Sequence, residues 1–114
     1  MILTVDIGGT HTRLAMADED ASGIQPAYFR SYRSEKYRDV DEVIQDYQTS
    51  IGIQAKRAVI GVPGPVLNGT ARATNLPWEL EEKGLAERLG FSSVKLINDV
   101  EALGYAIDVL APDD

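Results

Sequence analysis

The chain has 114 residues, enough for one ordinary domain, and its 44% hydrophobic content is typical of a globular protein with a packed core. It contains no cysteine, which excludes disulfides, thiolate metal sites and a cysteine nucleophile, and which fits a reducing cytoplasm. A net charge of −7 argues against nucleic-acid binding, because such proteins usually carry a basic face. Neither a signal peptide nor a membrane-spanning segment is expected, because no sufficiently long apolar run is present.

The first third of the chain predicts three consecutive strands joined by hairpins. Residues 2–7 are rich in β-branched side chains, and residues 10–18 alternate between apolar and polar. Residues 23–33 form a third such run, with Pro26 near its start, where a missing N–H group is tolerated.

The middle of the chain predicts a helix and then a buried strand. Asp39 is a good N-cap, Glu42 lies three positions later, and apolar residues recur at helical spacing as far as Gly52. Residues 57–62 form a nearly continuous apolar run, typical of a strand covered on both faces, which Pro63 ends abruptly.

The last part predicts a hairpin around Asn68-Gly69, a helix over residues 79–89, a strand over residues 93–99 and a helix over residues 100–110. The order of elements predicts an α/β fold. Its mixed sheet would have antiparallel first three strands, parallel strands after the first helix, and flanking helices.

An acid and two glycines follow the first strand. Glycines such as Gly8 and Gly9 permit a positive φ and let a ligand approach the main chain, and successive N–H groups there can converge on an anion. Asp6 could hold a Mg²⁺-bound water, because Mg²⁺ keeps several waters and takes few protein ligands. The alternative is a plain Gly-Gly hairpin turn. The stretch matches neither a Walker loop nor a Rossmann fingerprint.

Two further groups of polar residues follow predicted strands. Asn98 and Asp99 end a late strand, where α/β proteins place ligands, and Asp99 could accept a proton from an attacking hydroxyl. The alternative is that they only cap the next helix. Thr74 and Asn75 offer hydrogen bonds suited to a polyol or could be turn residues, and Trp78 is expected to be a core anchor rather than a sugar platform.

The remaining charged residues suggest no second site. His11 is the only histidine and has no nearby His or Cys, so a surface turn position is expected rather than a transition-metal site. The basic group of Arg30, Arg33, Lys36 and Arg38 lies beside acids and is expected to be a solvated loop.

Together these stretches resemble the bacterial glucokinase family. "DIGGTHTRLA" resembles its first phosphate motif, "GVPGPV" and "TNLPWEL" its sugar-side segments, and "LINDVEALGYAI" the segment with its catalytic aspartate. The motifs follow in the family's order over essentially the whole chain. The resemblance implies a ribonuclease-H-like lobe of the actin-like ATPase and sugar-kinase superfamily. It also implies transfer of the γ-phosphoryl group of ATP, with Mg²⁺, to the 6-hydroxyl of glucose.

The resemblance also assigns roles to individual residues. Asp99 would be the general base. The sugar site would be formed by Asn98, Asp99, Thr74, Asn75 and the main chain near Pro63 and Gly64. The nucleotide side would be formed by Asp6, which would organise Mg²⁺ through water, and by Ile7, Gly8, Gly9, Thr10, His11 and Arg13. His11 departs from the asparagine often found at this position of the family, which leaves its side-chain role open.

Members of the family have a second, larger lobe, and this sequence stops where that lobe would begin. Residues 1–114 are therefore expected to be the N-terminal, small lobe of a two-lobe sugar kinase without its C-terminal lobe. That lobe is expected to be inactive alone, because one wall of a cleft can neither exclude water nor align substrates. The expected partners are a sugar and ATP, with no nucleic acid and no membrane. A homodimer of the complete enzyme stays open.

Three alternatives remain. The substrate could be another hexose or an N-acetylhexosamine, as in the related repressor–kinase family, and the phosphoryl donor could differ from ATP. A sugar-sensing repressor is disfavoured, because the glycine motif begins five residues after Met1 and the charge is acidic. A degenerate, non-catalytic module is disfavoured by the retention of Asp6 and Asp99.

Overall fold

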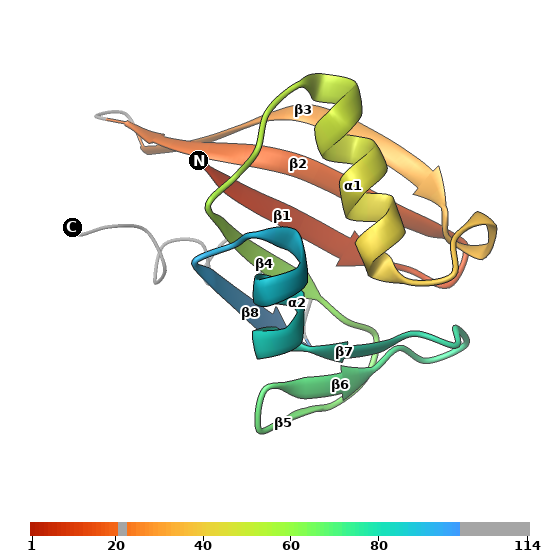
Figure 1. Ribbon diagram of the computed structural model, residues 1–114. Helices are drawn as coiled ribbons and strands as arrows, with labels where there is room; N and C mark the ends of the chain where they lie inside the picture. Colours follow the sequence, from red (N-terminus) through yellow and green to blue (C-terminus); the bar gives the residue numbers. More distant parts are fainter. Residues whose placement is uncertain (21–22, 99–114) are drawn as a thin grey trace.

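The structure is a computed structural model that describes residues 1–20 and 23–98, so the helix expected over residues 100–110 lies outside the described residues. A five-stranded sheet runs through the molecule in the order β3-β2-β1-β4-β8 (Figure 1). Its strands are β1 (Ile2–Ile7), β2 (His11–Asp20), β3 (Gly23–Arg33), β4 (Arg57–Gly61) and β8 (Ser93–Ile97). As expected, β1, β2 and β3 are antiparallel neighbours, whereas β4 is parallel to both β1 and β8.

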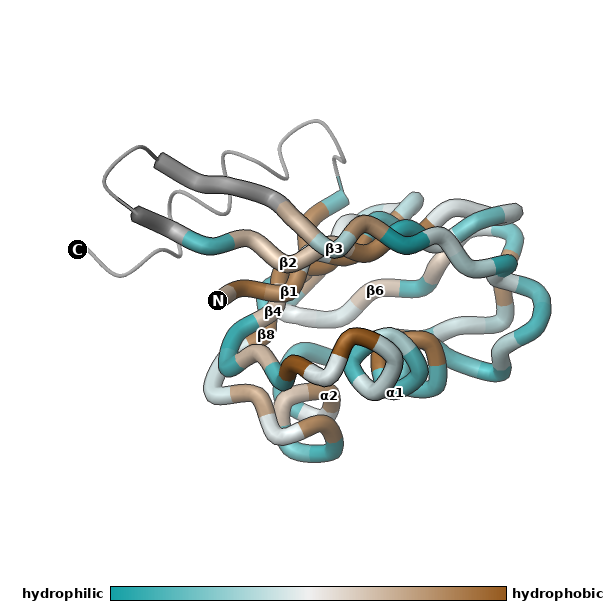
Figure 2. The backbone as a smooth tube through the Cα atoms, turned by 90° about the horizontal axis from the view of Figure 1, so that it is seen from above, coloured by the Kyte–Doolittle hydropathy of each residue, from teal (hydrophilic) through white to brown (hydrophobic). Residues whose placement is uncertain are grey.

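The two described α-helices, α1 (Val40–Ile51) and α2 (Glu82–Leu89), lie on the same side of this sheet (Figure 2). The N-cap prediction for α1 is confirmed, since the Asp39 side chain accepts a hydrogen bond from the N–H group of Glu42 at 3.1 Å. The Glu42 carboxylate accepts in turn from the N–H group of Arg38 at 2.8 Å, which lowers the pKa of Glu42. The helix ends at Gly52, which has a left-handed conformation.

The main core lies between the sheet and these helices. Leu3, Val5 and Ile7 of β1 belong to the same buried cluster as Val43 and Ile44 of α1. Side chains alternate between the two faces of a strand, so Thr4 and Asp6 point to the other face of the sheet. The sheet therefore separates Asp6 from the helix-covered core.

Trp78 is part of this core, as expected, with 1% of its surface exposed. Its indole N–H group donates to the backbone carbonyl of Tyr37 at 3.3 Å, beside the short helix η1 (Ser34–Lys36). Burial and a hydrogen bond to Asp46 raise the pKa of Tyr37 to about 12, so its hydroxyl stays a neutral donor. Trp78 thus ties the segment after Asn75 to the turn that follows β3.

The helix expected over residues 79–89 begins later than the sequence predicts. Residues Glu79–Glu81 form strand β7, which pairs with β6 (Thr70–Arg72), and α2 begins only at Glu82. Strand β5 (Val66–Leu67) completes this smaller sheet, with the expected hairpin at Asn68. Pairing prevails over helix propensity here because Leu80 is buried while Glu79 forms an ion pair with Arg72 across the strands.

The basic group beside α1 is solvated, as expected, but it is not one loop, because Arg30 and Arg33 belong to β3 and Lys36 belongs to η1. Arg30, Arg33, Lys36 and Arg38 are all exposed. Arg33 forms an ion pair with Glu35 of η1 and Arg38 forms one with Glu42 of α1, so nearby acids balance two of these charges.

Candidate functional site

The carboxyl ends of three parallel strands bring the predicted site residues to one edge of the sheet. Asp6 of β1 is paired with Gly61 of β4, and Gly61 is paired with Ile97 of β8. Asn98 follows directly and is exposed, whereas Asp99 lies outside the described residues. Ligands of open α/β sheets bind beyond the carboxyl ends of their strands, so this edge is the candidate site.

The glycines in the turn between β1 and β2 are not needed to provide a positive φ. The expectation of positive φ is wrong, because the only glycines with positive φ in the described part are Gly52, Gly69 and Gly90. Gly8 is required instead by a close approach. Its N–H group donates to the carbonyl of His11 at 2.9 Å, and a Cβ atom on Gly8 would lie 2.6 Å from that oxygen. The glycine allows the two strands to close tightly.

Gly9, in contrast, is exposed and nearly free of neighbours. A Cβ atom on Gly9 would meet only the Cβ atom of Asn75, at 3.8 Å. The glycine turn therefore lies directly beside the segment with the predicted sugar residues, although Gly9 and Asn75 are far apart in the sequence.

Asn75 has an unusual backbone, with a φ of 67°. Asparagine tolerates this left-handed region better than most residues, but glycine adopts it at lower cost. The side chain is exposed, and within residues 1–20 and 23–98 its amide has no hydrogen-bond partner. Asn68 of the hairpin has a similar backbone, with a φ of 54°, so the conformation is that of a turn residue, and the exposed amide of Asn75 is available to a ligand.

The loop after β4 is attached to the same segment. The hydroxyl and the N–H group of Thr74 both donate to the carbonyl of Pro63, the latter at 3.1 Å. A Cβ atom on Gly64 would lie 2.8 Å from the carbonyl of Arg72, so only glycine fits there. Pro63, Gly64 and Thr74 are thus brought together, but the proton of the Thr74 hydroxyl is already used within the protein.

The carboxylate of Asp6 is half-buried, and Arg13 lies opposite it on β2. No ion pair joins these two side chains in the described part of the chain. The same part holds no cluster of three or more His, Cys, Asp or Glu side chains that could bind a metal. A single half-buried carboxylate suits a cation that keeps most of its water, as Mg²⁺ does.

Other predicted nucleotide-side residues differ in their exposure. Thr10, His11 and Arg13 are exposed, and His11 begins β2 as a surface residue. The Ile7 side chain is buried in the core with 1% exposed, so only its main chain can face a ligand.

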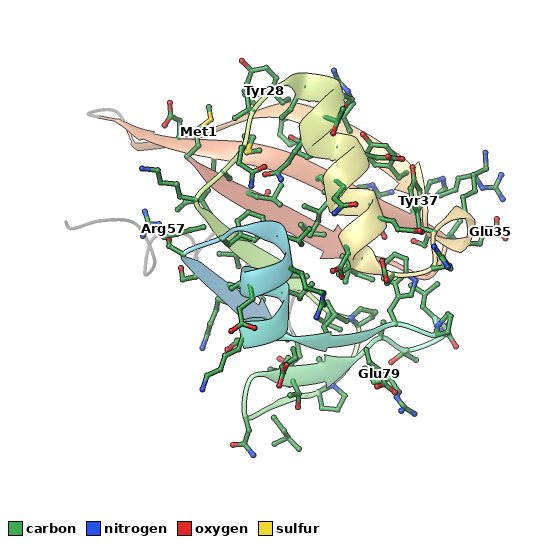
Figure 3. All side chains as sticks on the ribbon, in the orientation of Figure 1. Met1, Tyr28, Glu35, Tyr37, Arg57 and Glu79 are labelled. Atoms are coloured by element: carbon green, nitrogen blue, oxygen red, sulfur yellow. The ribbon has the colours of Figure 1, made fainter. Side chains whose placement is uncertain are left out.

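Sequence reasoning missed two residues of this region. Gly61 is paired with Asp6 at the end of β4, a neighbour that its place at the end of an apolar strand could have suggested. Ser34 contacts the glycine turn from η1, and nothing in its sequence surroundings points to that contact. Figure 3 shows the neighbouring Glu35 and Tyr37 at the end of the molecule where η1 lies.

A pocket of about 500 Å³ lies elsewhere, over β5, β6 and β7, and is lined by residues that include Leu67, Arg72 and Arg88. None of the predicted site residues lines it. The candidate site is therefore placed by the convergence of strand ends and loops, and not by this pocket.

None of the helices in residues 1–20 and 23–98 has the length and apolar character needed to cross a membrane.

The chain is 40% identical over 114 residues to glucokinase of Xanthomonas campestris pv. campestris, matching 99% of this chain but 34% of that protein. It therefore spans about a third of the length of the curated relatives it matches.

Solved structures of glucokinases are also similar to this chain. A glucokinase from an Antarctic psychrotroph superposes with a TM-score of 0.82 at 29% identity, covering 94% of this chain and 34% of that one. A ROK family glucokinase from Streptomyces griseus, solved in complex with glucose and AMPPNP, has a TM-score of 0.63 at 25% identity, covering 88% and 34%. A family model described as glucokinase matches residues 3–114. The chain therefore belongs to the glucokinase family.

Proposed function

We propose that the chain is the N-terminal lobe of an ATP-dependent, cytoplasmic glucokinase that transfers the γ-phosphoryl group of ATP to the 6-hydroxyl of glucose. The observation that carries the proposal is the proximity of the glycine turn to Asn75, since a Cβ atom on Gly9 would lie 3.8 Å from Asn75 Cβ. Phosphoryl transfer requires the phosphate and sugar sites to share one crevice. The Streptomyces griseus relative, which holds glucose and an ATP analogue, supports both ligand classes.

On the nucleotide side, the exposed turn would face the phosphates. The N–H groups of Gly9 and Thr10 have no acceptor in the described part of the chain and are free to bind phosphate oxygens. Asp6 would hold a Mg²⁺ ion through a bound water, and the exposed Arg13 and His11 would border the site. The ion, when bound, supplies positive charge that offsets the phosphates.

On the sugar side, Asn75 and Asn98 would hydrogen-bond sugar hydroxyls, with Thr74 and the main chain of Pro63 and Gly64 forming the wall behind them. Asp99 would accept the proton of the 6-hydroxyl while that oxygen forms its bond to the γ-phosphorus and the bond to ADP breaks. Asp99 follows Ile97 by two residues in the sequence, and Ile97 is the β8 residue in register with Gly61 and Asp6.

The first test is turnover. The two-lobe protein, in which this chain continues into its own C-terminal lobe or that of the Xanthomonas campestris glucokinase, is expected to phosphorylate glucose with ATP. The isolated 114-residue chain is expected to be inactive, because it offers only one wall of the cleft. A coupled ADP-release assay measures both. Absence of turnover in the two-lobe protein, or robust turnover by the isolated chain, would contradict the proposal.

The same assay separates the alternatives. Faster turnover of mannose or an N-acetylhexosamine than of glucose would show that this other sugar is the substrate. Sugar binding without turnover would indicate a sensor.

Asn75 offers a second test, because substitution by glycine removes the side chain while still allowing the left-handed backbone conformation. In the two-lobe protein, Asn75→Gly is expected to keep the melting temperature, since glycine accepts a φ of 67°, but to raise the KM for glucose about tenfold through loss of the amide. Asn75→Ala is expected to lose affinity and also about 1 kcal/mol of stability. Thermal unfolding and steady-state kinetics measure the two effects. An unchanged KM for glucose in Asn75→Gly would remove Asn75 from the site.

A further inference from the structure

A buried serine from a distant segment supports the glycine turn. Ser34, the first residue of η1, has no exposed surface. Its hydroxyl donates to the carbonyl of Gly8 at 2.7 Å, and its N–H group donates to the carbonyl of Thr10 at 3.0 Å. One residue thus holds two carbonyl groups of the turn on the side that faces η1.

Thr12 completes this contact from β2. It is also fully buried, and its Oγ1 atom lies 2.8 Å from the Ser34 Oγ atom. A hydroxyl has a single proton, and a carbonyl can only accept, so the Ser34 proton must go to Gly8. Thr12 is therefore the donor to Ser34, and the three groups form a directed chain from Thr12 through Ser34 to Gly8. Successive hydrogen bonds of this kind strengthen one another in a buried setting.

The geometry of the peptide bond carries this constraint to the exposed side of the turn. The structure has no cis peptide bond, so the C=O of Gly8 and the N–H of Gly9 point in opposite directions. Because Ser34 holds the Gly8 carbonyl inward, the N–H of Gly9 is held outward. That N–H group has no acceptor among the residues described.

The segment that carries Ser34 is itself held in place. The N–H group of Tyr37 donates to the Ser34 carbonyl at 3.1 Å, and the carbonyl of Tyr37 accepts from the buried Trp78 indole at 3.3 Å. Because this segment is fixed, the Ser34 hydroxyl can determine the orientation of the Gly8 carbonyl rather than adapt to it.

We propose that Ser34, supported by Thr12, is a positioning residue that orients the N–H group of Gly9 toward a bound nucleotide phosphate. This role rests on the function proposed above. It predicts that removal of either hydroxyl weakens nucleotide binding without changing the sugar site, because the two hydroxyls bond to each other and to the Gly8 carbonyl of the turn.

The test uses the two-lobe protein. Ser34→Ala is expected to raise the KM for ATP about tenfold and to leave the KM for glucose within twofold. Thr12→Val is expected to act in the same direction, and Thr12→Ser, which keeps the hydroxyl, to restore the KM for ATP. Amide hydrogen exchange of Gly8, whose N–H group donates to the His11 carbonyl, is expected to be faster in Ser34→Ala and in Thr12→Val.

Thr4→Val is the matched control. Thr4 is a buried threonine whose hydroxyl donates to the carbonyl of Ala15 at 3.0 Å, between the same two strands but away from the turn. It is expected to lose similar stability with an unchanged KM for ATP. If Ser34→Ala and Thr4→Val give the same KM for ATP, the positioning role is wrong. If the wild-type protein binds no Mg-ATP, the proposed function fails and the phosphate role of Ser34 fails with it.

Discussion

Replacing Asp99 by asparagine in the two-lobe protein is expected to lower kcat about 10³-fold, the scale of losing a general base. Asparagine keeps the size and much of the hydrogen bonding of the side chain but cannot accept the proton of the sugar hydroxyl. The KM for glucose is therefore expected to stay within a few-fold. Steady-state kinetics with glucose as the varied substrate measures both constants.

Asn98→Ala is the comparison for this prediction. The exposed Asn98 immediately precedes Asp99 and would bind sugar hydroxyls rather than move a proton. It is expected to raise the KM for glucose with a smaller effect on kcat. If Asp99→Asn retained most of kcat, or if it acted only through melting temperature, the pair would be a helix cap and the catalytic assignment would be wrong.

Replacing Gly9 by alanine is expected to leave the fold intact and to raise the KM for ATP tenfold or more. The backbone at Gly9 does not have a positive φ, and the new Cβ atom would make only an ordinary contact, 3.8 Å from Asn75 Cβ. The methyl group would occupy the open side of the turn, where a phosphate would approach the main chain. Thermal unfolding and the kinetics of ATP use in the two-lobe protein measure the two outcomes.

Gly8→Ala is the matched variant with the opposite result. Its Cβ atom would lie 2.6 Å from the His11 carbonyl, so the strands must shift, which is expected to cost about 2 kcal/mol of stability. The two substitutions are at adjacent positions, but Gly9→Ala is expected to weaken ATP binding and Gly8→Ala to lower stability. Normal ATP kinetics in Gly9→Ala would show that phosphates do not approach this turn.

Local sequence patterns predict much of this fold because each depends on near neighbours. The Asp39 cap, the helix end at Gly52 and the Asn68 hairpin all follow from side chains or backbone preferences within a few residues. The buried position of Trp78 follows from its size. These predictions hold because no distant contact opposes them.

The predictions that failed did so where adjacent strands pair with each other. Residues Glu79–Glu81 have helix-forming composition, but pairing with β6 makes them a strand. Gly8 reads as a residue with positive φ, whereas the close approach of His11 explains it. In both cases the deciding partner is set by the approach of another strand rather than by the residue's own preference.

The sequence by itself determined most of the strand and helix types, the Asp39 cap and the chemical groups available to the site, because these depend on side chains and local backbone energies. Only the tertiary structure decided that Gly9 lies beside Asn75, that Gly61 is paired with Asp6, and that the Ser34 hydroxyl binds the Gly8 carbonyl of the turn. Such contacts arise from strand register and from loops that return from distant parts of the chain. Strand register depends on the packing of the whole sheet, which no local pattern specifies.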